Sequence, residues 1–427
     1  MFDVMFSIAS GQPDPNLLPL YDQNFRPREL ILFVTEEMQF KAQDFVSAIK
    51  DALPKKATAD IVKVSGEKDI NEFRKKIEEK INTYLSENKS IVFNLTGGTK
   101  IMSIAAFSVY KKYSEHITAI YLNINDNKFT VFKGFNGDDF IYAEEDLNIR
   151  KNFDFKTYFG ARGIDLEVLD DELKIPTAIK EAFYNKILDP SVTSQDFMSF
   201  FNSLCKGAIL DKKYRKDSGK KPLVLYEADK TTCAKLEDIF KDLSDYVSVI
   251  RERDDNTNKV CLIWKNTSNG APHAKYFAGG WMEDYCYKLV KEIVGSNNVL
   301  KNVRIERKKE RVISDPNGSP NELDVCFFYN STLHVIEVKT VSFKPKKSNT
   351  PTNEDHSTRK DNQDYIHKLI SIGTDLGLKT KLALVSFNKI TDSLEKRAQE
   401  KKIKVFSDDQ VKDPKIFREN LKKWIKS

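Results

Sequence analysis

Three charged residues lie in a stretch that otherwise has the pattern of a β-hairpin. Asp324 opens an apolar run, a short turn follows at residues 330–331, and Glu337 and Lys339 lie in the return run. Because side chains alternate along a strand, Glu337 and Lys339 point to the same face. Two carboxylates and an ammonium are costly to bury in a sheet unless they bind something. A divalent metal with a phosphodiester is one solution, and a surface hairpin with an incidental ion pair is the alternative.

The carboxylates of this hairpin are suited to hold a metal ion. Asp324 and Glu337 offer the hard oxygen donors that Mg²⁺ or Mn²⁺ prefers, so we expect both to be direct ligands. Glu283, at the start of a predicted helix, is expected to complete the shell or to hold a metal-bound water. Lys339 would orient or activate the attacking water and neutralise charge on a phosphate. These four residues predict phosphodiester hydrolysis, and Lys368, on a later helix, faces either this site or solvent.

A second candidate binding site is the loop Asn94-Leu-Thr-Gly-Gly-Thr-Lys100, between a predicted strand and a predicted helix. Glycines let the backbone approach a ligand closely, and the N–H groups at a helix N-terminus attract phosphate. The loop is neither a Walker A loop nor a Gly-x-Gly-x-x-Gly motif, so no ordinary nucleotide cofactor is specified. The alternative is a glycine-rich turn with a threonine cap. Ser10 and Gln12 follow the first strand and should lie nearby, because parallel strands end at one edge of a sheet.

The elements that position these stretches fall into three units. Residues 1–150 alternate between strands and helices, which predicts a mainly parallel sheet covered on both faces, a Rossmann-like α/β domain. Residues 151–270 have the helix and hairpin order of a winged-helix-like linker unit, which either separates and dimerises domains or binds nucleic acid. Residues 271–427 form a second α/β domain, which contains Glu283, the hairpin and the later helices.

The composition is that of a soluble globular protein, with 40% hydrophobic and 31% charged residues in 427. The apolar runs are too short to cross a membrane, and the N-terminus has no secretory signal pattern. Five scattered cysteines form no metal-type pair, which favours a reducing cytoplasm. Residues 301–311 hold six Lys and Arg against two acids, within a net charge of +6. Beside a metal-type site, such a cluster favours nucleic acid as a partner.

At these residues the sequence is similar to a known class of nucleases. Asp324 followed by Glu337-Val-Lys339 resembles the PD-(D/E)xK nuclease motif, with Asn321-Glu-Leu-Asp324 in place of the usual Pro-Asp. Gly279-Gly-Trp-Met-Glu283 resembles the helix that opens the nuclease domain of CRISPR ancillary nucleases. Those proteins join a CARF (CRISPR-associated Rossmann fold) domain to a restriction-endonuclease-like domain. The Asn94–Lys100 loop resembles the CARF ligand motif, and the order of the domains agrees.

The resemblance implies a CARF domain at 1–150, a linker unit at 151–270 and a restriction-endonuclease-like domain at 271–427. It implies a homodimer that binds a cyclic oligoadenylate, most often the tetra-adenylate made by a type III CRISPR complex, across its two-fold axis. Binding would switch on the cleavage of single-stranded RNA or DNA, or nicking of duplex DNA, with Mn²⁺ or Mg²⁺. The residues implied to contact the ring are Ser10, Gln12, Asn94, Thr96, Gly97, Gly98, Thr99 and Lys100.

Two other functions remain open at the level of the sequence. One is a ligand-sensing regulator that binds nucleic acid and has an inert nuclease-like domain. The other is a ring nuclease, in which the first domain cleaves the activator and Lys100 stabilises the transition state. The presence of Asp324, Glu337 and Lys339 together favours an active nuclease over the regulator.

Overall fold

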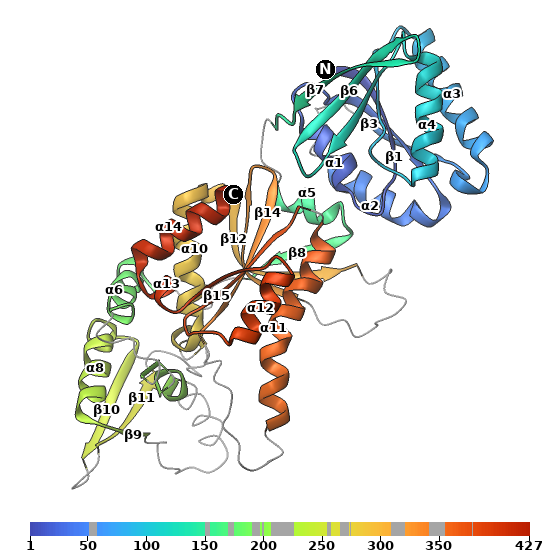
Figure 1. Cartoon of the computed structure of the whole chain (residues 1–427). Helices are drawn as coiled ribbons and strands as arrows, with labels where there is room; N and C mark the ends of the chain where they lie inside the picture. The colour runs from blue at the N-terminus through green and yellow to red at the C-terminus, as the bar shows by residue number, and fades with distance from the viewer. Residues whose placement is uncertain are drawn as a thin grey trace.

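A computed structural model gives the fold of the chain (Figure 1). It describes residues 1–50, 58–149, 154–169, 175–189, 197–198, 200–205, 226–253, 258–264, 273, 275–308, 321–340, 355–377 and 379–427. None of the described helices is long and apolar enough to cross a membrane. The chain forms an N-terminal domain, a C-terminal domain and a smaller middle unit.

The N-terminal domain is built on a twisted sheet that is seven-stranded within the described residues, in the order β3-β2-β1-β4-β5-β6-β7. Strands β1 to β5 are parallel, and β6 and β7 are antiparallel additions at one edge. The predicted mainly parallel sheet is therefore confirmed. The strands are β1 (Phe2–Ile8), β2 (Pro27–Val34), β3 (Thr58–Lys63), β4 (Ile91–Asn94), β5 (Thr118–Asn123), β6 (Lys128–Asn136) and β7 (Asp139–Asp146).

Helices cover both faces of this sheet (Figure 1). Helices α1 (Asp14–Tyr21) and α2 (Gln39–Ile49) share one apolar core with it, and α3 (Ile70–Ser86) and α4 (Lys100–Tyr113) share another. In α3, for example, Phe73, Ile77 and Ile81 recur at helical spacing and are fully buried, so they form the apolar face that packs the helix against the sheet.

The C-terminal domain has a mixed sheet in the order β16-β15-β14-β13-β12-β8. Helices α10 and α14 pack on one face, and α11 and α12 pack on the other. Its elements are β8 (Ile164–Val168), α10 (Trp281–Val294), β12 (Val299–Arg307), β13 (Asn321–Tyr329), β14 (Thr332–Lys339), α11 (Asp355–Leu376), β15 (Lys381–Ser386), α12 (Asp392–Glu400), β16 (Lys404–Ser407), α13 (Asp409–Lys412) and α14 (Pro414–Lys426).

Part of the predicted linker belongs to this sheet. Strand β8 pairs antiparallel with β12 and forms the edge of the sheet, although residues 151–270 were expected to be a separate unit. The short helix α5 (Phe155–Gly160) precedes it and packs against α2 of the N-terminal domain. Alternation over only five residues gave β8 no distinctive pattern, and its partner strand lies over 130 residues away in the sequence.

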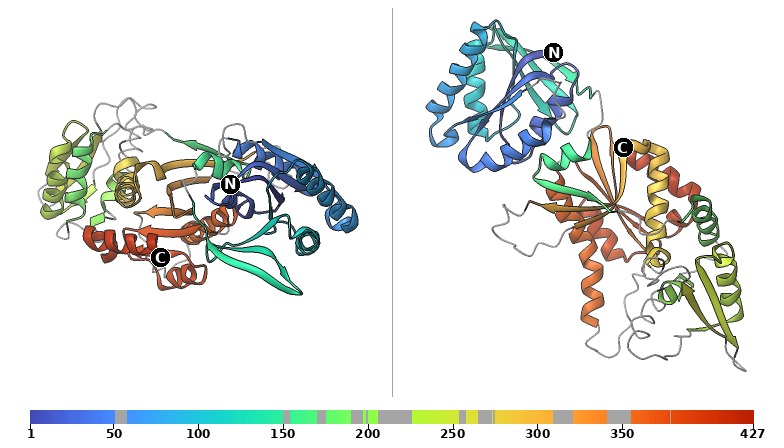
Figure 2. Two further views of the ribbon diagram at one scale, coloured as in Figure 1. Left: turned by 90° about the horizontal axis from the view of Figure 1, so that it is seen from above. Right: turned by 180° about the vertical axis from the view of Figure 1, so that it is seen from behind.

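The middle unit lies at the end of the C-terminal domain that is remote from the N-terminal domain (Figures 1 and 2). Whether it acts as a dimerising spacer or binds nucleic acid stays a prediction. Its described elements are α6 (Thr177–Ile187), β9 (Tyr226–Ala228), α8 (Lys230–Phe240), β10 (Val247–Arg253) and β11 (Asn258–Trp264), with an antiparallel sheet in the order β10-β11-β9. The predicted helix at 194–210 lies partly outside the described residues.

Candidate functional site

The predicted hairpin is confirmed, and its turn fixes the register. Asn330 and Ser331 have φ of 45° and 62°, the left-handed pair that a two-residue hairpin turn requires. Val325 then pairs with Ile336. One further step places Asp324 opposite Glu337, and directly opposed residues share a face of the sheet. The turn therefore brings the two carboxylates together.

Asp324, Glu337 and Lys339 form one buried cluster. The Nζ of Lys339 is 2.7 Å from Oε1 of Glu337 and 3.5 Å from Oδ2 of Asp324. The backbone N–H of Val338 donates to the same Oδ2 of Asp324 at 2.6 Å. Asp324 and Glu337 retain only 6% and 2% of their accessible surface. Each charge is thus held by the others rather than by water.

Burial and mutual charge shift the protonation of the cluster. Burial, and then the charge of Glu337, raises the pKa of Asp324 to about 6. Burial alone would lower the pKa of Lys339, but the carboxylates of Asp324 and Glu337 outweigh it and raise that pKa above its usual value. Lys339 therefore remains an ammonium at neutral pH. It can stabilise negative charge on a phosphate, but as an ammonium it has no lone pair with which to accept a proton as a general base.

Lys368 also belongs to the cluster. The sequence left open whether it faces this site or solvent, and the structure places it at the site. From α11, its Nζ lies 3.0 Å and 2.9 Å from the two oxygens of Glu337. Its side chain is 30% exposed, whereas that of Glu337 is 2% exposed. Glu337 is therefore the centre of the cluster, because it accepts hydrogen bonds from two ammonium groups.

Glu283 approaches the cluster from the other side of the sheet. It lies on α10, which packs with Val325, Ile336 and Val338, whereas the acid cluster is on the opposite face. A π-helical turn at Tyr276–Gly280 precedes α10. The hydroxyl of Thr340, the residue after Lys339, donates to the carbonyl of Ala278 in this turn at 2.8 Å. The start of α10 is thus fixed at the end of β14.

Burial, followed by the charge of Asp324, raises the pKa of Glu283 to about 8. Among the described residues, however, no three His, Cys, Asp or Glu side chains form a ready-made metal cage. Whether Glu283 completes the shell or holds a metal-bound water therefore stays a prediction, and it would do either from the helix on the opposite face. The donor chemistry of Asp324 and Glu337 still fits a hard divalent ion, since Mg²⁺ commonly takes one or two carboxylates and keeps several waters.

The loop after β4 is shaped largely by Asn94, whose position corrects an expectation. Asn94 was expected to contact the ring, but its side chain is fully buried. Its amide donates to the carbonyl of Pro15 at 2.9 Å, and its Oδ1 accepts from the N–H of Thr96 at 3.1 Å. The hydroxyl of Thr96 in turn accepts the N–H of Leu122 at 2.8 Å. Both side chains therefore hold the loop in place.

The two glycines of this loop lie against the end of β1. A Cβ at Gly97 would fall far inside contact distance of the carbonyl oxygen of Ile8, and Gly98 has φ of 83°. Thr99 caps α4, its hydroxyl accepting the N–H of Met102 at 3.3 Å. Lys100 is exposed, and within the described chain no group pairs with its ammonium. Thr99 and Lys100 are thus the accessible side chains of the motif.

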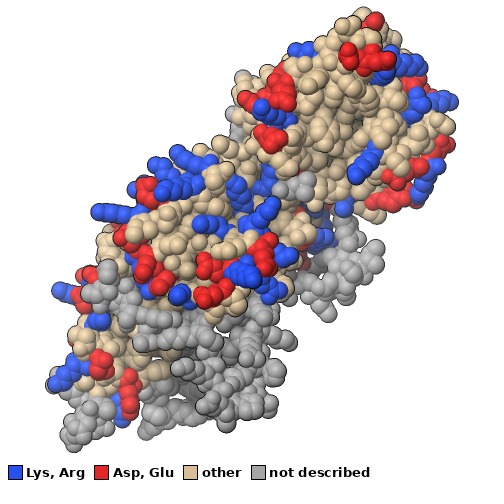
Figure 3. Space-filling model, viewed as in Figure 1, with Lys and Arg blue, Asp and Glu red and all other residues tan. Residues whose placement is uncertain are grey.

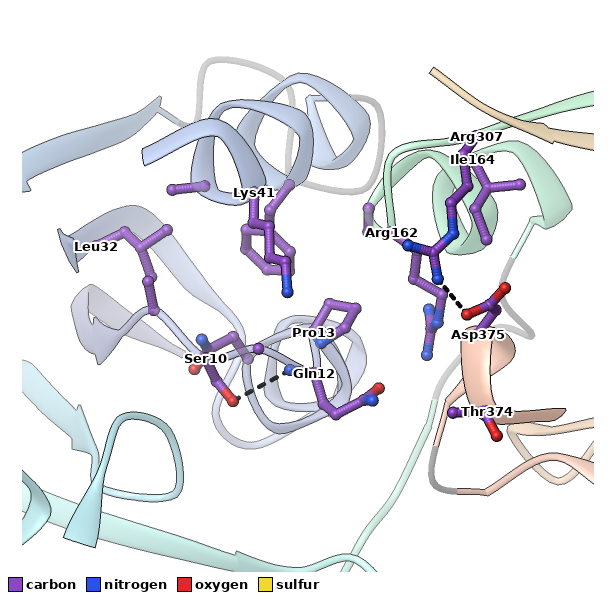
Figure 4. A pocket seen from close by; sticks show the side chains of 16 residues that line it. Ser10, Gln12, Pro13, Leu32, Lys41, Arg162, Ile164, Arg307, Thr374 and Asp375 are labelled. Carbon is purple, nitrogen blue, oxygen red and sulfur yellow. Dashed lines mark hydrogen bonds and ion pairs between the residues drawn. The ribbon is translucent and has the colours of Figure 1, made fainter. Parts of the chain in front are cut away.

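Ser10 and Gln12 lie in the neighbouring loop, between β1 and α1. The hydroxyl of Ser10 accepts the backbone N–H of Gln12 at 3.4 Å. Both residues line a cavity of about 130 Å³ between the two domains. Figure 4 shows Lys41 from the N-terminal domain and Arg162, Arg307 and Asp375 from the other side around the same space. The loop expected to contact a ligand is therefore also a domain contact.

The basic cluster at 301–311 is used largely inside the chain. Lys301 pairs with Asp284, Arg304 with Glu167, Arg307 with Asp375, and Lys308 with Asp44. Residues 309–311 lie outside the described part. Figure 3 shows Lys and Arg interspersed with Asp and Glu over this domain on the face that it draws. The four described members that pair in this way are therefore each partly neutralised by an acid of the same chain.

The fold and the site together define a class of protein, a Rossmann-like sensor domain joined to a nuclease domain with an acid–lysine cluster. Residues 4–151 belong to the Card1 CARF domain family, and residues 272–427 belong to the Card1-like endonuclease domain family. The resemblance drawn from the motifs is confirmed. The chain has the organisation of the nucleases of type III CRISPR defence that cyclic oligoadenylate activates.

Two solved structures share the fold over nearly the whole chain. Protein VC1899 from Vibrio cholerae is 18% identical, with a TM-score of 0.72 over 99% of this chain and 98% of that one. Can2 from Sulfobacillus thermosulfidooxidans, solved in complex with cyclic tetra-adenylate, is 20% identical, with a TM-score of 0.69 over 100% of this chain and 98% of that one. No curated protein matches the sequence.

Proposed function

We propose that the protein is a metal-dependent endonuclease that cyclic tetra-adenylate switches on. The observation that carries this proposal is the cluster of Asp324, Glu337 and Lys339 in a chain that also has a CARF domain. A chain with an inert nuclease-like domain would have no need to bury two carboxylates within reach of one ammonium. The tetra-adenylate bound to Can2, a protein of the same fold, supports the choice of ring.

In the nuclease site, Asp324 and Glu337 would hold Mn²⁺ or Mg²⁺. The ion, when bound, would polarise the phosphodiester and lower the pKa of an attacking water. Lys339 stays charged and would stabilise the negative charge that develops on the phosphate. Glu283 would hold a proton or a water at the end of β14, because its raised pKa keeps it partly protonated at neutral pH.

In the sensor domain, the backbone N–H groups of Gly97 and Gly98, the hydroxyl of Thr99 and the ammonium of Lys100 would bind the phosphates of the ring. Ser10 and Gln12 would border the ring from the neighbouring loop. Asn94 and Thr96 would act indirectly, since their polar atoms hold the loop. This division separates residues that touch the ring from residues that place the loop.

The proposed active form is a homodimer. Ile101 and Ile104, directly after Lys100 on α4, are 52% and 70% exposed. Two large apolar side chains on one helical face beside the ring loop fit an interface with a second copy. A two-fold axis at that interface would let a symmetric ring contact both copies of the loop.

The substrate would be single-stranded RNA or DNA. The test is incubation of the protein with labelled single strands of each kind, with Mn²⁺, and with cyclic tetra-adenylate, cyclic hexa-adenylate or no ring. We expect cleavage only when a ring is present, with the tetra-adenylate most effective. Absence of cleavage with every ring size would refute the proposal. Consumption of the ring without cleavage of either strand would instead identify a ring nuclease.

A further inference from the structure

Helix α11 touches the sensor side of the molecule at its C-terminal end. The hydroxyl of Tyr158, in α5, donates to the carbonyl of Leu376, the last residue of α11, at 2.7 Å. Gly377 follows with φ of 111°, and a Cβ there would lie 2.5 Å from a guanidinium nitrogen of Arg162 and 2.6 Å from Oδ2 of Asp14. Only glycine fits this position. The end of α11 is therefore seated directly on Asp14 and Arg162.

Asp14 and Arg162 form a buried ion pair between the domains. Their side chains are 4% and 3% exposed. Asp14 is the first residue of α1, so it follows the loop that contains Ser10 and Gln12. The guanidinium of Arg162 lies 3.6 Å from the ring centre of Tyr158 and donates to the carbonyl of that residue at 2.8 Å. Movement of the sensor loop would thus act on both groups that hold the end of α11.

Lys368 lies nearer the middle of α11. Lys368 and Leu376 are eight positions apart, which is about 12 Å along a helix. Between them, Leu369 and Ile372 are buried against the sheet, and a Cβ at Gly373 would lie 2.7 Å from Cδ1 of Leu382 in β15. The helix is packed too closely to bend locally, so displacement at Leu376 would reach Lys368.

A continuous apolar core supports the same connection. One cluster of buried side chains includes Met5 and Leu17 of the sensor domain, Tyr158 of α5, and Leu369 and Leu376 of α11. Close-packed interiors transmit small displacements instead of absorbing them. The two domains therefore meet through packed side chains on the face of the nuclease sheet that carries Glu337.

We propose that α11 is the element that couples the sensor loop to the nuclease site, with Lys368 as the positioning residue that holds Glu337. The inference rests on the proposed function, because it names the path by which ring binding alters cleavage. Through Asp14 and Arg162, a shift of the sensor loop moves the end of α11. The hydrogen bonds from Lys368 to the two oxygens of Glu337 then change, and the orientation of that carboxylate toward a divalent ion changes with them.

The first test removes only the hydrogen bond between Tyr158 and the C-terminal end of α11. Tyr158→Phe deletes the hydroxyl that donates to Leu376 and keeps the aromatic side chain that packs against Arg162. We expect cyclic tetra-adenylate still to bind, while the ratio of cleavage rates with and without the ring falls about fivefold or more, the lower end of typical allosteric coupling. The matched control is Tyr142→Phe, which removes a hydroxyl from the exposed strand β7 and should keep the wild-type ratio.

The second test concerns Lys368 and does not depend on activation. Lys368→Met removes a positive charge from both oxygens of Glu337, so Mn²⁺ should bind more tightly, as measured by the electron paramagnetic resonance signal of free Mn²⁺ in the ring-free protein. Cleavage at saturating Mn²⁺ and ring should nevertheless be slower, and Lys368→Arg should restore part of it. Lys396→Met, at an exposed position of α12, is the control.

The outcomes separate this inference from the proposed function. A wild-type protein that binds the ring but is not activated would refute the proposed function, whatever the variants do. A wild-type protein that is activated, with a Tyr158→Phe variant of equal activation ratio, would overturn the coupling through α11. Unchanged Mn²⁺ affinity in Lys368→Met would overturn the positioning role of Lys368.

Discussion

A single methyl group at Gly97 should disable the ring-binding loop without unfolding the protein. In Gly97→Ala, the new Cβ would overlap the carbonyl oxygen of Ile8 and lie 3.2 Å from Oδ1 of Asn16. The oxygen of Ile8 belongs to the backbone of a central strand and accepts the amide of Asn16 at 2.8 Å, so the loop must move instead. Such overpacking costs about 1–3 kcal/mol of the free energy of unfolding.

The displaced loop should also bind the ring poorly. Losing one charge-assisted hydrogen bond from the loop to a phosphate costs about 1.5–3 kcal/mol, which is roughly a tenfold to hundredfold loss of affinity. Chemical denaturation would measure the stability, and isothermal titration calorimetry would measure the affinity for cyclic tetra-adenylate. Gly11→Ala is the control for stability, because a Cβ at Gly11 would meet nothing within 4 Å. Wild-type affinity in Gly97→Ala would show that the ring does not bind against this loop.

Three further substitutions test the nuclease site, the ring-binding loop and the proposed dimer interface one at a time. Glu337→Gln removes the charge at the centre of the cluster and should lower the rate of cleavage about a hundredfold or more. Calorimetry should show unchanged ring binding. If the variant still cleaved at the wild-type rate, the metal would have to bind elsewhere. Lys100→Ala should weaken ring binding and shift stability by no more than about 0.5 kcal/mol, because its ammonium is exposed; unchanged affinity would exclude Lys100 from the ring site. Ile104→Asp should lower the molar mass measured by light scattering from dimer to monomer, and a dimer that persists would move the interface away from α4.

Local patterns in the sequence carried the main features of the site. Alternation along the return strand was enough to place Glu337 and Lys339 on one face, and the predicted turn at residues 330–331 brought that strand back beside the run that Asp324 opens. The position of a glycine-rich loop between strand β4 and helix α4 also followed from short-range signals. These predictions succeeded because a hairpin and a strand–helix turn are determined by residues that are close together in the sequence.

Long-range packing decided the remaining features. Glu283 was expected to complete the metal shell or to hold a metal-bound water, and only the assignment of α10 to a face of the sheet shows from which side it approaches. Asn94 was expected to touch the ring, and its burial depends on α1, whose position relative to β4 no local pattern gives. Strand β8 likewise finds its partner in β12 only in the folded domain. The one usable signal for Lys368 was a cationic side chain on a helix that follows the hairpin.

The central claim is that occupancy of the sensor domain sets the rate of the nuclease domain. The most direct measurement is the rate of cleavage of a labelled single strand at fixed Mn²⁺ while cyclic tetra-adenylate is titrated, compared with the binding curve of the same protein preparation. We predict that the two curves share one midpoint, and that Lys100→Ala shifts both to higher concentration together. A cleavage rate that stays constant while the ring saturates the protein would contradict the claim.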